Sequence, residues 1–372
     1  MRDNWQWPKL VFEPVAWLLF VSFYGSEVMN DLCESRQPGH RFTRRQFGLA
    51  AFGTGVLLIA GLSGLRHGGT MLRRSAMRMG TEVNLILYGP DDDSCERAAR
   101  RAFARMDALE LILSRHNQGS ELARLNREGR LPTASADLLK VMQEALMLSE
   151  KTEGAFDPTV LPLLGLYKKQ GDQWQAPAPA EVEAALTLVG YANVRIEGEA
   201  ISYAIPGMGV TLDGIGKGYA VDQAVLALAE IGFTDVYVEA GGDLMVSGTK
   251  ADGEPWRIGV ANPRPEHPRE MITIVLKDQA IATSGDYMQA FTPDRRFHHI
   301  VDPKNGFSPP ELASASVIAP EVMIADGLAT AAMVLGHERA TAILDTMEGC
   351  EALFIDKDLG QYLTSGFHTL QA

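Results

Sequence analysis

An aspartate and a threonine four residues apart form the first candidate metal site in this sequence. Asp326 and Thr330 lie in residues 325–330, which read ADGLAT and are expected to lie at the start of a helix. Residues four apart share one helix face, so the carboxylate and the hydroxyl project in the same direction. Both are hard oxygen ligands, which magnesium requires, and magnesium leaves room for substrate phosphates. The alternative is local: an aspartate near a helix N-terminus and a threonine whose hydroxyl bonds back to a carbonyl.

A glycine-rich turn offers the complementary chemistry, because it can hold a phosphate. Residues 212–219 read LDGIGKGY, with a short apolar run before them and a helical pattern after them. Glycines let a ligand approach the backbone closely, and free N–H groups at a helix start favour a phosphate, to which Lys217 adds charge. The order matches neither GxGxxG nor the P-loop. A plain tight turn therefore explains the motif equally well by itself.

Two further segments carry side chains of catalytic type. His298 and His299 can act as acid or base, bind a metal, or simply form hydrogen bonds in the interior. No Cys, His or Glu cluster surrounds them, so a zinc site is not expected. Residues 154–159 read GAFDPT and indicate a turn or a helix start, in which Asp157 can cap the helix as a purely structural alternative.

The elements that must position these residues alternate between helix and strand. Alternating apolar residues predict a strand at 82–88, acidic residues 91–93 predict a helix start, and residues 167–179 are expected to form a surface loop. Further helices are predicted at 136–151, 181–189, 219–231, 321–335 and 338–347, and further strands at 194–196, 200–204, 209–212, 235–239, 244–248, 256–260, 272–276 and 314–318. The strands are not joined by regular helical crossovers, which favours an α+β fold with largely antiparallel pairing.

Composition excludes some classes of function. The chain has 372 residues, 46% of them hydrophobic, and a formal net charge of −13. An acidic balance argues against a general nucleic-acid binder, because phosphate backbones attract basic faces. The three cysteines, Cys33, Cys95 and Cys350, are far apart and form neither a zinc pattern nor a disulfide framework.

The N-terminal part of the sequence predicts an export signal. Arg44 and Arg45 precede an uncharged apolar run at 47–65, which matches a twin-arginine signal and is long enough to cross a bilayer. The alternative is a chance Arg-Arg pair before a helix. We therefore expect an extension at 1–70 with signal and apolar segment, one domain at 71–372, and a periplasmic protein whose extension can anchor it to the inner membrane.

Taken in order, the motifs resemble those of the ApbE family of FAD:protein FMN transferases. The segments that carry the resemblance are 79–81, 114–126, 154–159, 213–222, 239–243, 280–287, 299–306 and 325–336. Each segment alone is a weak indication of the family, but eight of them in the same order along the chain are a specific one. The resemblance implies a single α+β domain, FAD as the FMN donor, Mg²⁺, and a Thr or Ser acceptor in a partner flavoprotein.

By matched position, the resemblance also implies a set of site residues. Asp326, Thr330 and the backbone of Gly214 would bind magnesium, and His299 matches the functionally important histidine of the family. The flavin would lie against Met79, His116, Ala155, Phe156, Asp157, Lys217 and Ile281.

The sequence departs from the usual pattern of the family at three places. His116 replaces an aromatic residue, Ala329 replaces an additional acidic ligand of some members, and the acidic residue of the glycine turn is Asp213, two places later than usual. With the twin-arginine leader, this variant is similar to the branch of the family that serves nitrous-oxide respiration.

The expected reaction is magnesium-dependent transfer of FMN from FAD to a Thr or Ser hydroxyl of a partner, with release of AMP. Magnesium would neutralise charge on the diphosphate, and His299 or Asp213 would accept the hydroxyl proton. The expected acceptor is a flavoprotein subunit of a membrane redox complex, of the nitrous-oxide respiration, Rnf or Nqr type. The alternatives are an FAD pyrophosphatase that gives FMN and AMP, a non-catalytic periplasmic FAD-binding protein, and a purely structural protein.

Overall fold

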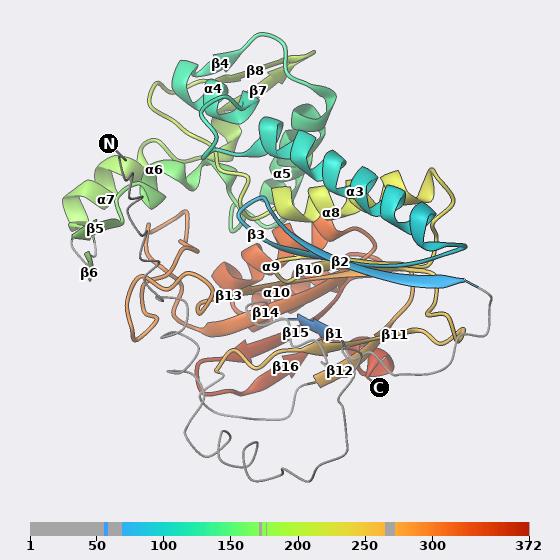
Figure 1. Cartoon of the computed structure of the whole chain (residues 1–372). Helices are drawn as coiled ribbons and strands as arrows, with labels where there is room; N and C mark the ends of the chain where they lie inside the picture. The colour runs from blue at the N-terminus through green and yellow to red at the C-terminus, as the bar shows by residue number, and fades with distance from the viewer. Residues whose placement is uncertain (1–55, 59–68, 171–172, 176, 265–271, 372) are drawn as a thin grey trace, which may run out of the picture. The chain divides into compact units, whose positions relative to one another are not determined.

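A computed structural model of the chain describes residues 56–58, 69–170, 173–175, 177–264 and 272–371 (Figure 1). The predicted twin-arginine pair and most of the apolar run after it lie outside the described residues, so the signal, the anchor and the boundary at residue 70 stay predictions. Within the described residues, no helix has the length and apolarity needed to span a bilayer.

An eight-stranded sheet is the centre of the fold. Its strand order is β16-β15-β14-β13-β10-β9-β3-β2, and each neighbouring pair is antiparallel. The strands are β2 (Thr70–Arg78), β3 (Thr81–Gly89), β9 (Val236–Ala240), β10 (Asp243–Ser247), β13 (Gln279–Gly285), β14 (Leu312–Ala319), β15 (Glu351–Asp356) and β16 (Gln361–Leu363). The predicted α+β fold with antiparallel pairing is confirmed.

Helices cover one face of this sheet and form the main core with it (Figure 1). They are α3 (Asp92–Leu113), α5 (Ala136–Lys151), α8 (Gly216–Ala229), α9 (Val322–Leu335) and α10 (His337–Leu344). Helix α3 starts where its acidic residues predict, with the Asp91 carboxylate accepting a hydrogen bond from the Ser94 N–H at 2.7 Å. Helices α8 and α9 are rich in Ala, Val and Leu, and most of their residues are buried, as expected for helices that are apolar on all sides.

A second, smaller sheet covers the other face. It has the order β1-β11-β12 and comprises β1 (Val56–Leu58), β11 (Trp256–Val260) and β12 (Ile272–Leu276). Trp256 and Ile258 of β11 form a second apolar core with Tyr237 and Ile281 of the large sheet, and η3 (Phe367–Leu370) adds Phe367 to it. The central strands β9, β13 and β14 of the large sheet are therefore buried on both faces.

The remaining elements surround the helical side. They are α4 (Glu121–Glu128), β4 (Arg130–Leu131), η1 (Pro158–Val160), α6 (Leu161–Leu164), β5 (Lys168–Gln170), β6 (Gln173–Gln175), α7 (Pro179–Leu186), η2 (Tyr191–Asn193), β7 (Val194–Glu197) and β8 (Ala200–Tyr203). All elements from β1 onward belong to one unit that spans Ala51–Ala372.

Three local predictions between residues 167 and 212 were wrong, and the helices predicted at 219–231 and 338–347 have shifted bounds as well. Residues 209–212 form no strand, because the Val210 N–H donates to Asn126 Oδ1 and the Thr211 N–H donates to the Pro158 carbonyl, each at 2.8 Å. The expected loop at 167–179 contains the β5–β6 hairpin. The helix predicted at 181–189 begins earlier, at Pro179, because proline suits the first helical turn, and it ends at Leu186.

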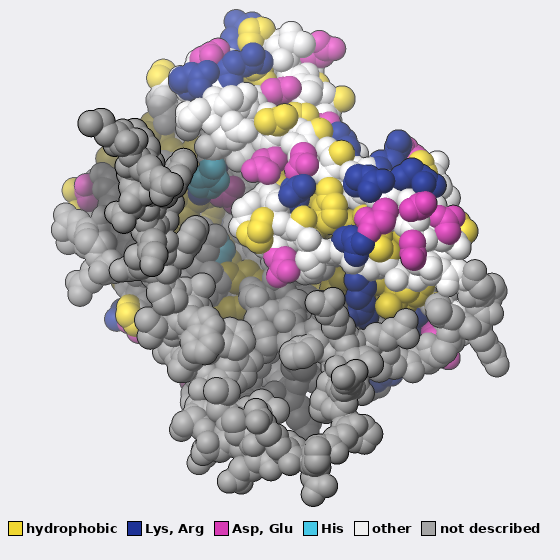
Figure 2. Space-filling model, in the orientation of Figure 1, with side chains coloured by type: hydrophobic (Ala, Val, Ile, Leu, Met, Phe, Trp, Pro, Cys, Tyr) yellow, Lys and Arg dark blue, Asp and Glu magenta, His cyan; other side chains and the backbone are white. Residues whose placement is uncertain are grey.

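The described surface on the α3 side mixes both signs of charge. Figure 2 shows Lys and Arg side chains interspersed with Asp and Glu side chains there, and no large area of one sign on the described part of that face.

Candidate active site

Three charged side chains from three different elements meet beside the glycine turn. Asp326 of α9 is only 3% exposed, and its Oδ2 accepts a hydrogen bond from the Gly218 N–H at 3.2 Å. The same oxygen lies 3.7 Å from the Lys217 Nζ of α8. Lys217 also forms an ion pair with Asp243 at the start of β10. Two buried carboxylates therefore share one ammonium group.

This cluster carries more negative than positive charge in a buried place. Burial and the neighbouring Asp243 raise the pKa of Asp326 to about 7, and Lys217 and the Gly218 N–H oppose that shift. Burial raises the pKa of Asp243 as well, against the opposing effect of Lys217. Burial alone would lower the pKa of Lys217, but the two carboxylates outweigh it and hold the pKa above its usual value. The cluster would gain stability from a further cation.

The Thr330 hydroxyl joins α9 to the glycine turn and to the sheet. A Cβ atom added to Gly214 would lie 2.8 Å from Thr330 Oγ1, so the backbone of the turn and this hydroxyl are in direct contact. Thr330 Oγ1 also lies 3.2 Å from Ser284 Oγ of β13. The three residues predicted to bind metal, Gly214, Asp326 and Thr330, thus lie together, and their oxygen-rich donor set fits magnesium.

His299 is held near this cluster as a neutral imidazole. Burial lowers its pKa to about 4, Lys217 adds to that shift, and Asp213 opposes it. The backbone N–H of His299 donates to the Gln289 carbonyl at 3.1 Å, which fixes its segment. Its Nδ1 is buried and has no hydrogen-bond partner among the described residues. A neutral imidazole has one acceptor nitrogen, and the tautomer decides which of the two it is.

Asp213, the other predicted base, lies in a different environment. Its carboxylate forms a salt bridge with Arg115, with 2.6 Å between Oδ2 and Nε, and its side chain is 48% exposed. The charge of Asp213 is therefore already matched by a guanidinium at the rim of the site. The His299 Nδ1, by contrast, has no hydrogen-bond partner among the residues that the structure describes.

A buried ion cluster lies close enough to His298 to affect its charge. Asp286 is fully buried at the end of β13, and its two oxygens bind the guanidinium of Arg264 at 2.7 Å each. Lys357 binds the same carboxylate from the end of β15. His298 is also fully buried, and its Nε2 lies 3.5 Å from the Pro309 carbonyl oxygen, too far for a strong hydrogen bond.

Among the residues predicted to bind flavin, Ala155, Phe156 and Asp157 form one buried group. The Asp157 Oδ1 accepts from the Thr159 N–H at 2.8 Å and from the Thr159 hydroxyl at 2.6 Å, while its Oδ2 accepts from the Tyr191 N–H at 3.0 Å. Asp157 is the N-cap of η1, so this residue has the capping role that the sequence offered as its structural alternative.

The other predicted flavin residues are spread around the site. Met79 lies in the β2–β3 turn with a positive φ of 51°, and its N–H donates to Glu110 Oε2 at 3.1 Å. His116 is exposed in the segment after α3. Ile281 is fully buried in the second core, on the face of β13 away from α9, so its side chain is not brought together with the others.

Sequence reasoning assigned no role to three residues of this site: Asp243, Ser284 and Arg115. Each lies inside one of the motif segments, and Asp243 follows two glycines at the end of a buried strand, which is a recognisable signal. No local pattern, however, indicates that Asp243 pairs with Lys217 or that Arg115 pairs with Asp213.

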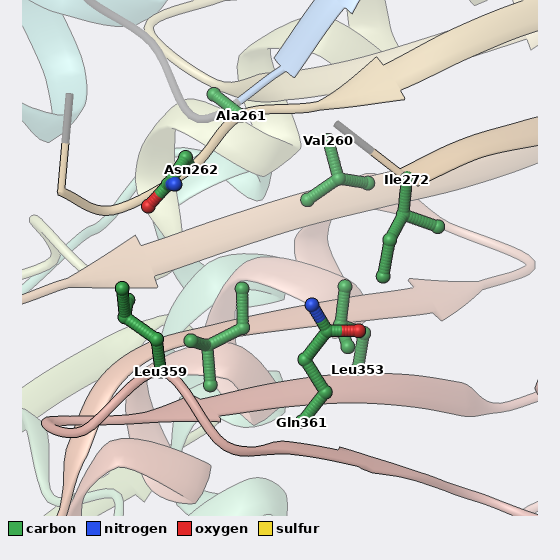
Figure 3. A pocket seen from close by; sticks show the side chains of 8 residues that line it. Val260, Ala261, Asn262, Ile272, Leu353, Leu359 and Gln361 are labelled. Carbon is green, nitrogen blue, oxygen red and sulfur yellow. The ribbon is translucent and has the colours of Figure 1, made fainter. Parts of the chain in front are cut away.

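A separate pocket opens on the other side of the sheet (Figure 3). Val260, Ile272, Leu353 and Leu359 are among its lining residues, and Asn262 and Gln361 are the polar ones. Its lining includes no charged side chain that could hold a diphosphate, so the cluster around Asp326 remains the candidate site.

Comparisons with known proteins agree with this assignment. The sequence model of the ApbE family matches residues 79–354. The FAD:protein FMN transferase of Haemophilus influenzae is 31% identical over 77% of this chain and 87% of its own length, and that of Vibrio cholerae is 32% identical over 82% and 94%. Among solved structures, the flavin transferase ApbE from Vibrio cholerae covers 81% of this chain and 99% of its own, with 31% identity and a TM-score of 0.73. The apo form of the flavinyl transferase ApbE from Pseudomonas stutzeri gives 29% identity, coverage of 82% and 98%, and a TM-score of 0.72.

Proposed function

This chain belongs to the ApbE family, and from that premise we propose that it transfers FMN from FAD to a hydroxyl group of a partner protein and releases AMP. One observation in this structure supports the proposal independently of the family. The oxygen donors Asp326 and Thr330 face the glycine turn at the start of α8, where Lys217 supplies positive charge. This is the arrangement that a cation and the diphosphate of FAD require.

The metal of the proposed reaction is magnesium. Asp326, Thr330 and the backbone carbonyl of Gly214 would hold it, and the contact between Gly214 and Thr330 supports this donor set. When bound, magnesium neutralises charge on the diphosphate. The N–H groups of the glycine turn and the ammonium of Lys217 bind phosphate oxygens of FAD and orient them for attack.

The remaining chemistry is a substitution at phosphorus. The acceptor hydroxyl forms a new P–O bond with the FMN phosphate of FAD, the P–O bond to AMP breaks, and AMP leaves. The hydroxyl proton passes to His299, whose buried Nδ1 has no partner among the described residues. Exclusion of water decides between transfer and hydrolysis, because water would give free FMN instead of a protein adduct.

The proposed acceptor is a Thr or Ser of a flavoprotein subunit in a membrane redox complex of the nitrous-oxide respiration, Rnf or Nqr type. The location that we propose is the periplasm, with the extension at 1–70 in contact with the inner membrane. Support for both comes from the twin-arginine pair Arg44-Arg45, the uncharged run after it and the motif variant at Asp213.

Mass spectrometry of the acceptor tests the proposal directly. The full-length protein is mixed with FAD, Mg²⁺ and a candidate acceptor subunit, and the expected product is an acceptor heavier by one FMN. D326A should abolish the adduct, while D91A, which removes a carboxylate from the far N-cap of α3, should leave it intact. Free FMN without adduct would instead establish a pyrophosphatase, and FAD that stays intact in the presence of Mg²⁺ would establish a binding protein. Full adduct formation by D326A would contradict the metal assignment.

A further inference from the structure

We propose that Asp222 is a positioning residue for the metal site, because its carboxylate on α8 holds the first turn of α9 and so fixes Asp326 against the glycine turn. This inference rests on the proposed function, in which Asp326 and Thr330 of α9 bind magnesium. Asp222 itself contacts none of the proposed reacting groups.

The first turn of α9 is capped by another helix. The Val322 N–H donates to Asp222 Oδ1 at 2.8 Å, and the Met323 N–H donates to Asp222 Oδ2 at 2.9 Å. The N-cap residue of α9 is Glu321, whose side chain makes no capping hydrogen bond. Helix N-termini are normally capped by the residue that precedes them. Here the cap is a carboxylate that lies 100 residues earlier in the sequence.

Gly218, one helical turn before Asp222, brings the two helices into backbone contact. A Cβ atom at Gly218 would lie 2.5 Å from the Val322 carbonyl oxygen and 2.8 Å from Met323 Cα, so a side chain has no room there. The Gly218 N–H donates directly to Asp326. Because residues four apart share a helix face, one face of α8 both caps the start of α9 and donates to its metal-binding aspartate.

The capped turn and the metal ligands belong to the same rigid helix. Asp326 follows Met323 by three residues, and Thr330 lies one turn further on. A shift of the first turn therefore moves both ligands relative to Gly214, and displacements of about 1 Å are enough to impair a site of this kind. The carboxylate is needed at Asp222 because asparagine has a single acceptor oxygen and would turn an amide N–H toward one of the two donors.

A cap that serves stability alone would lower the melting temperature without changing the affinity for metal. The experiment therefore measures Mn²⁺ binding, with Mn²⁺ titrated into the FAD-saturated full-length protein and the free ion followed by EPR. D222N is compared with D91N, the matched control, because Asp91 also caps a helix but lies away from the site at the start of α3. D326A is measured alongside to test the metal site itself.

We expect D222N to weaken Mn²⁺ binding about tenfold, as loss of groups that orient metal ligands commonly does. D91N should bind Mn²⁺ like the wild type even if its melting temperature falls. Wild-type affinity in D222N, together with lost affinity in D326A, would overturn this inference alone. Wild-type affinity in D326A would overturn the metal site of the proposed function. If D222N does not fold, D222E takes its place, because it keeps both carboxylate oxygens one methylene further out. We expect D222E to weaken Mn²⁺ binding by less than tenfold. Unchanged Mn²⁺ affinity in D222E would overturn the inference.

Discussion

Gly214 and Thr330 touch across the candidate site, since a Cβ atom on Gly214 would lie 2.8 Å from Thr330 Oγ1. The contact joins the glycine turn to the helix that carries both predicted side-chain ligands for magnesium. It explains why glycine is needed at residue 214: any side chain would displace the hydroxyl.

A methyl group at residue 214 should therefore weaken the response to magnesium. In G214A the new Cβ pushes the Thr330 hydroxyl out of its place, while the fold keeps its core because the displaced group is the end of a side chain. We expect the Mg²⁺ concentration for half-maximal FAD turnover to rise about tenfold. G119A is the control, because Gly119 is exposed and a Cβ there meets only Asn117 Oδ1 at 3.4 Å. An unchanged magnesium dependence in G214A would contradict the donor set.

Removal of the ammonium between the two buried carboxylates should destabilise the protein in a magnesium-dependent way. K217M leaves Asp243 and Asp326 without their shared counter-ion, which is expected to lower the free energy of unfolding by about 3 kcal/mol. Saturating Mg²⁺ should recover part of the loss, because a divalent ion compensates the same charges. Thermal melts with and without Mg²⁺ measure both effects. K140M, which removes the exposed pair with Glu144, should change stability by less than about 1 kcal/mol, and equal effects of the two variants would refute this interpretation.

The imidazole of His299 should act as the proton acceptor of the transfer step. H299Q is expected to slow adduct formation by a factor of about 10² to 10⁴, the usual contribution of a positioned base. Because burial holds the pKa of His299 at about 4, the ring stays neutral well below pH 6.5. At saturating Mg²⁺, which keeps Asp326 ionised, the acid limb of the pH–rate profile should accordingly lie near pH 4 to 5. An acid limb centred near pH 6.5, or a fast H299Q variant, would assign the proton to another group.

Acid should destabilise the fold through His298. Burial lowers its pKa from 6.5 to about 4, Lys357 and His299 add to the shift, and Asp286 opposes it. Below pH 6.5 the unfolded chain binds a proton at this residue and the folded chain does not. The stability linked to His298 is thus fully present above pH 6.5 and is lost as the pH falls toward 4.

We expect this one residue to account for about 2 kcal/mol of the stability lost between pH 7.5 and pH 5. Urea unfolding at both pH values, for the wild type and for H298Q, measures it as the difference between the two pH dependences. Other titrating groups contribute equally to both proteins and cancel in that difference. Equal pH dependence in H298Q and the wild type would show that folding does not change the pKa of His298.

Much of the fold could be predicted because its signals are local. The helix at 136–151 and the strands at 256–260 and 272–276 have the predicted bounds, since apolar periodicity and capping residues act within a few positions. Residues 209–212 show where this reasoning fails. Their apolar, extended sequence indicates a strand, but the Val210 N–H and the Thr211 N–H bond to Asn126 and to Pro158, which no local pattern reveals.

The sequence by itself determined the antiparallel α+β class, the family resemblance and the face shared by Asp326 and Thr330, because periodicity and spacing depend on neighbours along the chain. Only the tertiary structure decided which residues pair around this helix face. Lys217 pairs with an aspartate 26 residues away, Asp213 with an arginine 98 residues away, and Asp222 caps a helix 100 residues away. The physical reason is that buried charges such as Asp243 and Asp222 need a partner, and the choice of partner, for them as for the half-exposed Asp213, depends on how the helices pack on the sheet.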